Sequence, residues 1–189
     1  MKVTRFVILV FAFTGGCSLL ATTEVGQFRA TSKQAAGQTG VAAVTRAGHY
    51  VHTDSVSYGL GVGLRTKVAP QLKQYAVSTD VSVSPRLRAV TPFIRAGVNA
   101  YQAESVAGDF GYGMFSPYGE AGLMVQLGRS SGGTRVYLTA AASVEYDLRF
   151  TDQASQGYWA ALGGIAFAAP RAKPEKIRFA PRGIKMKRK

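Results

Sequence analysis

The feature that most limits the fold of this chain is the alternation of apolar and polar side chains over residues 135–150 (RVYLTAAASVEYDLRF). A period of two residues is that of a β-strand, and it argues against a helix. The alternation runs for sixteen residues without a glycine or a proline, far beyond the usual strand length of about 5–6 residues. Strands of this length occur where a sheet curls or spans something, so the segment predicts a strand of a curled sheet.

The same alternation recurs along the chain and predicts six further strands and a weaker one. The good segments are 40–50, 58–65, 75–84, 93–101, 118–127 and 157–167, and the weaker one is 26–33. Tight turns at 84–86 and 128–133 alternate with a long loop, rich in glycine and aromatic residues, at 102–117. Short turns at one end and longer loops at the other are typical of an all-β, antiparallel up-and-down β-barrel, here of about eight strands.

The net charge of +13 is concentrated in the last nineteen residues. Residues 171–189 hold nine basic residues and one acid, a sum of +8, and the first sixteen residues add +2, which leaves +3 for the rest. The body is therefore nearly neutral and the basicity belongs to the C-terminal end. A basic chain can indicate nucleic acid binding, but the export signal described below makes nucleic acid an unlikely partner.

The polar faces of the best predicted strands carry as many positive as negative charges. The set consists of Arg65, Asp80, Arg95, Glu120, Arg135, Glu145, Asp147 and Arg149. In a membrane barrel the apolar faces meet lipid, and these charges form an interior ion network, because an unpaired buried charge is costly. In a water-soluble barrel or sandwich the apolar faces turn inward and the charges meet water. The charge balance alone does not distinguish the two.

The N-terminal residues have the order of a secretory signal peptide. Lys2 and Arg5 form a short positive region, residues 6–13 (FVILVFAF) are apolar, and small residues precede Cys17. Eight apolar residues are too few to cross a bilayer as a helix, which takes about 20. We therefore expect the chain to be exported.

Cys17 is the one cysteine of the chain and stands at the expected processing site. Residues 1–18 resemble a bacterial lipoprotein signal, which implies that the Cys17 thiol receives a diacylglyceryl group and becomes the mature N-terminus. In that family, Ser18 at the following position suggests sorting to the outer membrane. An ordinary signal peptide, cleaved for instance after Ala21, is the alternative.

The body resembles small bacterial outer-membrane β-barrels over about residues 27–167. Such barrels tend to end on a strand with alternating apolar residues and a terminal aromatic, a pattern that residues 159–167 follow up to Phe167. The resulting division is a signal peptide at 1–16, a tether and possible first strand at 17–34, the barrel at 35–168 and a basic, disordered tail at 169–189.

Motifs of catalysis and metal binding are weak. The segment 128–132 fits G-x-S-x-G around Ser130, but it joins two predicted strands, whereas the hydrolase motif joins a strand to a helix. His49 and His52 are the only histidines, and a third metal ligand is not evident. Glu145 and Asp147 share a face with arginines, which favours ion pairing over acid–base catalysis. We expect no enzyme, no metal site and no cofactor.

These observations predict a lipid-anchored envelope protein of the outer membrane of a Gram-negative bacterium, with a structural or partner-binding role. The expected partners are membrane lipid, through acylated Cys17, and an envelope protein complex or an anionic envelope polymer, through the tail. A lipocalin-like carrier of a small apolar ligand is the alternative. Candidate contact residues are Phe110, Tyr112 and Phe115 in the 102–117 loop, Tyr118 directly after it, and Arg182, Lys185, Lys187, Arg188 and Lys189 in the tail. The four aromatic residues could equally form the interfacial belt of a membrane barrel.

Overall fold

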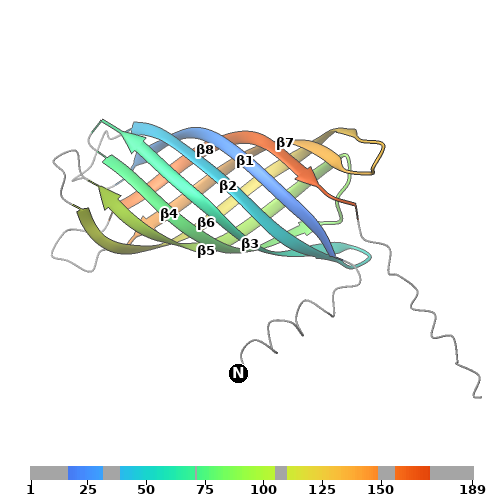
Figure 1. The fold of residues 1–189 in the computed structure, drawn as a ribbon, viewed down its shortest axis with the longest axis horizontal. Helices are drawn as coiled ribbons and strands as arrows, with labels where there is room; N and C mark the ends of the chain where they lie inside the picture. The colour runs from blue at the N-terminus through green and yellow to red at the C-terminus, as the bar shows by residue number, and fades with distance from the viewer. Residues whose placement is uncertain (1–16, 32–38, 71, 105–109, 149–155, 171–189) are drawn as a thin grey trace, which may run out of the picture.

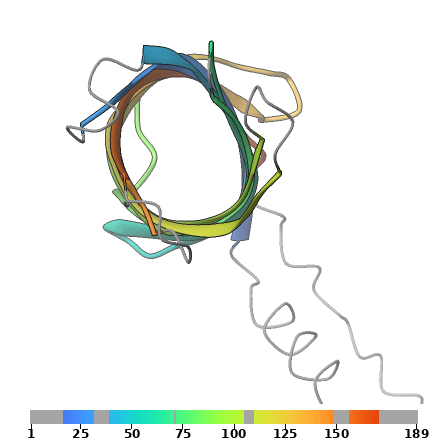
Figure 2. The same ribbon diagram turned by 90° about the vertical axis from the view of Figure 1, so that its left-hand side faces the viewer.

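Eight antiparallel strands close into one barrel, as the alternation predicts. The structure is a computed structural model and describes residues 17–31, 39–70, 72–104, 110–148 and 156–170. The strands are β1 (Cys17–Ala30), β2 (Thr39–His52), β3 (Val56–Ala69), β4 (Leu72–Pro85), β5 (Val90–Glu104), β6 (Phe110–Arg129), β7 (Arg135–Asp147) and β8 (Gln156–Ala168). Figure 1 shows the strands inclined to the barrel axis, and Figure 2 shows the closed ring.

Each strand pairs with its neighbours in the sequence, and β1 pairs with β8 to close the barrel. The closing seam runs from Leu20 opposite Ala168 to Ala30 opposite Tyr158. Since the number of strands is even, the start of β1 and the end of β8 lie at the same end, together with the turns 53–55, 86–89 and 130–134 (Figure 1). We call this the turn end, and the other the opposite end.

The structure changes two sequence-based boundaries. The possible first strand within 17–34 is present as β1, which runs from Cys17 to Ala30, so residues 17–30 belong to the barrel and not to a tether. The expected long loop at 102–117 is largely strand, because β5 continues to Glu104 and β6 begins at Phe110. Glycine and aromatic residues alternate over 110–113, a period of two that is compatible with a strand.

Side chains that point into the barrel form two apolar clusters separated by charged residues. One cluster belongs to the opposite end and consists of Phe28, Ala30, Ala42, Val44, Ala69, Leu72, Tyr158, Ala160 and Leu162. The other belongs to the turn end and consists of Leu20, Tyr50, Phe93, Met124, Tyr137, Ala166 and Ala168. The barrel interior is thus filled by side chains, as expected for about eight strands.

Candidate functional site

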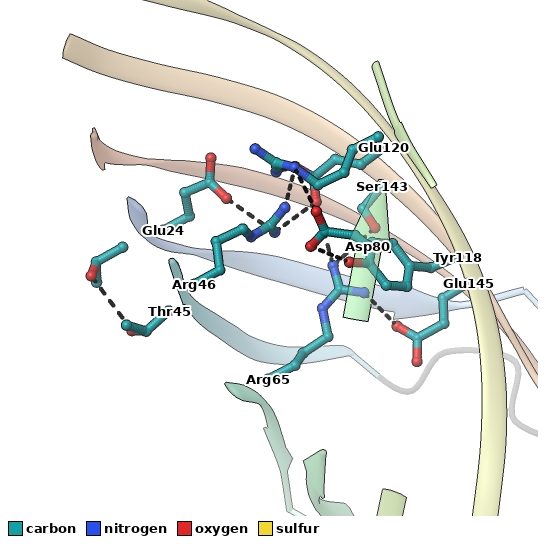
Figure 3. Close-up of polar contacts among 11 residues, drawn as sticks. Glu24, Thr45, Arg46, Arg65, Asp80, Tyr118, Glu120, Ser143 and Glu145 are labelled. Carbon is teal, nitrogen blue, oxygen red and sulfur yellow. Dashed lines mark hydrogen bonds and ion pairs between the residues drawn. The ribbon is translucent and has the colours of Figure 1, made fainter. Parts of the chain in front are cut away.

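The charged interior is centred on Glu120 of β6, which is nearly inaccessible to solvent. Arg46 of β2 donates from Nη1 to Glu120 Oε1 at 3.2 Å and from Nη2 to Oε2 at 3.0 Å. Arg95 of β5 also donates to Glu120, and Arg65 Nη2 of β3 lies 3.7 Å from its Oε2. One carboxylate therefore holds guanidinium groups from three other strands (Figure 3).

A second branch of the network extends from Arg65 toward the opposite end. Arg65 Nη1 donates to Glu145 Oε2 at 2.9 Å, and Lys67 Nζ lies 3.0 Å from the other oxygen of Glu145. Asp147 accepts hydrogen bonds from Ser116 at 2.6 Å and from Gln74 at 3.2 Å. These contacts connect β3 and β4 with β6 and β7 across the interior, so they tie together strands that are not all neighbours in the sheet.

The remaining carboxylates of the interior are also paired. Glu24 of β1 lies 3.3 Å from Arg46 Nη2, and Asp80 of β4 accepts a hydrogen bond from the Tyr118 hydroxyl at 3.0 Å. The buried charged residues of the described chain are four cations and five anions: Arg46, Arg65, Lys67, Arg95, Glu24, Asp80, Glu120, Glu145 and Asp147. Such near balance, with each charged group within 4 Å of at least one group of opposite sign, is what a charged interior requires.

Glycines on the inner face of β3 make room for these polar side chains. A Cβ added at Gly61 would lie 2.7 Å from Asp80 Oδ1, and one at Gly59 would lie 2.7 Å from the Tyr50 ring. Both contacts are shorter than real Cβ contacts, so any other residue would displace its neighbour. The glycine-rich segment 58–65 is therefore explained by the space that the interior needs.

Six of the eight predicted network residues lie together inside the barrel: Arg65, Asp80, Arg95, Glu120, Glu145 and Asp147. Arg135 does not, because it lies at the turn end, where its Nη1 donates to the Leu87 carbonyl at 3.1 Å. Arg149 lies outside the described residues. Sequence reasoning missed Glu24, Arg46 and Lys67.

The proposed contact residues of the 102–117 region do not form one surface. Tyr118 points into the barrel and binds Asp80, so its assignment to a contact loop was wrong. Phe115 is exposed on the outer surface of β6. Phe110 and Tyr112 belong to β6, but their side chains lie outside the described part of the chain, as do the tail residues Arg182, Lys185, Lys187, Arg188 and Lys189.

Ser130 lies in the exposed turn between β6 and β7. Its hydroxyl accepts a hydrogen bond from the Thr134 backbone N–H at 3.2 Å, and the segment leads into a strand, so it is not a hydrolase elbow. His49 faces outward, whereas His52 contacts Ser18 at 2.6 Å and Ser57 at 2.7 Å. Among the described residues, no group of three or more metal-binding side chains occurs.

The outer surface of the barrel is apolar. Twenty-seven large hydrophobic side chains of the described residues are exposed, against eleven that are buried. The exposed set includes aromatic residues near both ends, namely Tyr58 and Phe167 toward the turn end and Tyr75, Tyr146 and Trp159 toward the opposite end. This distribution is the reverse of that in a water-soluble domain. No helix of membrane-spanning length and hydrophobicity occurs in the described residues.

A small apolar ligand would find little apolar lining in this interior, because charged side chains fill its middle. The lipocalin-like carrier hypothesis required an interior of leucine, valine and tyrosine. The charged network therefore argues against it.

Neither a protein-family model nor a curated protein sequence matches the chain. Among solved structures, it is similar to neisserial surface protein A (14% identity, 80% of this chain, 97% of that chain, TM-score 0.59). It is also similar to the N-terminal β-barrel domain of OprF from Pseudomonas aeruginosa (16% identity, 80% of this chain, 96% of that chain, TM-score 0.51). At these identities the likeness concerns the fold alone. The chain therefore shares the β-barrel fold of these two proteins.

Proposed function

We propose that the chain is a lipid-anchored outer-membrane protein of a Gram-negative bacterium whose barrel spans the bilayer and serves a structural or partner-binding role without catalysis. The observation that carries the proposal is the polarity of the barrel. Its charged residues are paired inside, and its large hydrophobic side chains point outward. Burying that outer surface in lipid removes it from water, and this stabilises the inserted barrel by about 25 cal/mol per Å² of apolar area.

The strand lengths fit a bilayer. A strand of 14 residues, such as β3, extends about 46 Å at 3.3 Å per residue and covers about 33 Å along the barrel axis when tilted by about 45°. The hydrocarbon core of a bilayer is about 30 Å thick. The aromatic residues exposed near both ends of the barrel suit the two membrane interfaces.

The extent of β1 supports processing before Cys17. Cleavage after Ala21 would remove Cys17–Ala21, five residues that pair with β2, and with them Leu20, which packs in the turn-end apolar cluster. Cleavage before Cys17 leaves the strand whole. Processing before Cys17, as in a lipoprotein, thus keeps all of β1, whereas cleavage after Ala21 would leave the barrel closed by the shorter pairing of residues 22–30 with β8.

Anchoring and spanning are compatible in this geometry. In outer-membrane barrels the short turns face the periplasm, so the turn end would lie at the inner leaflet. Cys17 begins β1 at that end, where acyl chains on it would enter the same leaflet. β8 ends on this side, so the basic residues 171–189 that follow it in the sequence would meet anionic lipid, an anionic envelope polymer or an envelope protein complex.

The experiment compares the wild-type chain with Cys17→Ser in the native host. Mass spectrometry of the wild type is expected to find a diacylglyceryl group on residue 17, and alkaline carbonate is expected to leave both proteins in the membrane, because the barrel itself spans it. If carbonate releases Cys17→Ser, the barrel is peripheral and held only by lipid. If the wild type carries no acyl group, the anchor is wrong while the barrel can still span.

A further inference from the structure

A cavity of about 350 Å³ opens at the turn end of the barrel. Three arginines from separate places in the sequence line it: Arg86 from the turn between β4 and β5, Arg129 at the end of β6, and Arg135 at the start of β7. Ser18 of β1 and His52 of β2 line it as well. None of the described residues that line the cavity is acidic.

Two of the three arginines are held close together by the backbone. Arg129 and Arg135 are direct partners in the register of β6 and β7, and like charges directly opposite in a sheet destabilise it. Arg135 is further fixed by its hydrogen bond to the Leu87 carbonyl at 3.1 Å. The arrangement therefore keeps positive charges together that would otherwise separate.

The described part of the chain places no carboxylate in the cavity wall to balance them. Its ion pairs all belong to the interior network, and none includes Arg86, Arg129 or Arg135. The chain that continues beyond Pro170 carries nine basic residues and one acid, so its own side chains would add to the positive charge. An anion from another molecule would compensate this charge.

We infer that this turn-end mouth binds a phosphate group. Guanidinium groups match phosphate oxygens with paired hydrogen bonds, and three of them can neutralise a doubly charged anion. Ser18, whose hydroxyl lies 2.6 Å from His52 Nε2, adds a hydroxyl group to the cavity wall. The cavity is at the small end of the range for ligand sites, so it suits one phosphate or phosphate-bearing headgroup rather than a polymer segment.

Two sources share this chemistry, namely free phosphate and the headgroup phosphate of an anionic lipid, and the test separates them. The whole chain is folded in a nonionic detergent, and inorganic phosphate is titrated while ³¹P NMR records binding. In parallel, phosphatidylglycerol is added to the micelles and native mass spectrometry counts the lipids retained. The variants are the triple change Arg86→Gln, Arg129→Gln and Arg135→Gln, and the control Arg88→Gln, an exposed arginine of the same turn that does not line the cavity.

The wild type is expected to bind at least one of the two probes, with the triple variant at least about tenfold weaker and Arg88→Gln within about twofold of the wild type. Binding of inorganic phosphate identifies a free anion as sufficient, and binding of phosphatidylglycerol alone identifies a lipid headgroup. The inference would be overturned if the wild type binds neither probe, or if Arg88→Gln loses as much binding as the triple variant. Retention of a folded barrel by each variant is checked by circular dichroism, and single Arg→Gln changes replace the triple variant if it does not fold.

Discussion

Arg46 and Glu120 are 74 residues apart in the sequence, yet the Arg46 Nη1 and Nη2 atoms donate to both oxygens of Glu120, at 3.2 and 3.0 Å. The pair crosses the interior from β2 to β6, strands that do not adjoin in the sheet. Since Arg95 and Arg65 also approach Glu120, this one carboxylate balances three guanidinium groups.

Replacing Glu120 by alanine is therefore expected to destabilise the barrel strongly. Removal of one partner leaves the buried guanidinium groups without their main counter-charge, at a cost of about 3–5 kcal/mol in the free energy of unfolding. Urea unfolding in phospholipid vesicles measures the effect. Asp54→Ala, in an exposed turn, is the control and is expected to stay within about 0.5 kcal/mol of the wild type. Equal effects of the two changes would mean that the network contributes little.

The closing seam can be tested with two adjacent glycines of β8. A Cβ added at Gly164 would lie 2.0 Å from the Thr23 carbonyl oxygen, whereas one at Gly163 would meet nothing nearer than 3.8 Å. Gly164→Ala is therefore expected to force β1 and β8 apart and to cost about 1–3 kcal/mol or more in unfolding free energy. Gly163→Ala is expected to be neutral or slightly stabilising. The reverse order of the two unfolding midpoints would contradict the register of the seam.

The strands were predictable because their outer faces are apolar. Residues 135–150 showed the alternation that β7 (Arg135–Asp147) follows, and the balanced charges on the opposite faces of these strands placed Asp80 and Glu120 in a common set of network candidates, with a membrane barrel and a soluble one both open. The weak alternation of β1, where Thr23 and Gln27 interrupt the outer face, hid Glu24 and the start of the strand at Cys17.

Pairing across the interior could not be predicted from the sequence. Periodicity assigns a residue to a face of its own strand, but it contains no information on which residues of other strands meet it. Lys67 lies two residues beyond the predicted strand 58–65, and only the register of β3 with its neighbours brings it near Glu145. Tyr118 was misassigned for a related reason. It begins the predicted strand 118–127, but it was grouped with the aromatic residues of the glycine-rich segment before it, and the sequence does not show that its hydroxyl meets Asp80.

A charged substitution tests whether the outer face of the barrel meets lipid. Leu64 lies near the middle of β3 and is 63% exposed, so in a spanning barrel Leu64→Arg places a charge deep in the hydrocarbon. This is expected to cost about 2–4 kcal/mol in vesicles. Gln27→Arg, an outward change nearer the end of β1, is the control and is expected to cost about 0–1 kcal/mol. If both changes are harmless in vesicles, the outer face does not meet lipid.

Deleting residues 171–189 is expected to weaken binding to anionic surfaces and to leave the barrel unchanged. The deletion lowers the net charge from +13 to +5, since that segment carries +8. Basic residues near an anionic membrane contribute about 1 kcal/mol each, and salt screens the effect. Co-sedimentation with isolated cell-wall sacculi and with anionic vesicles, at low and high salt, measures it. A loss of folded barrel, or unchanged and salt-independent binding, would exclude an electrostatic role for these residues.

The central claim, that the outer face of the barrel meets lipid, is tested most directly by the fluorescence of Trp159. It is the one tryptophan of the chain and is 43% exposed on the outer side of β8. In vesicles, lipids brominated on their acyl chains are expected to quench its emission strongly, while aqueous iodide has little effect. Strong quenching by iodide with no response to the brominated lipids would contradict the claim.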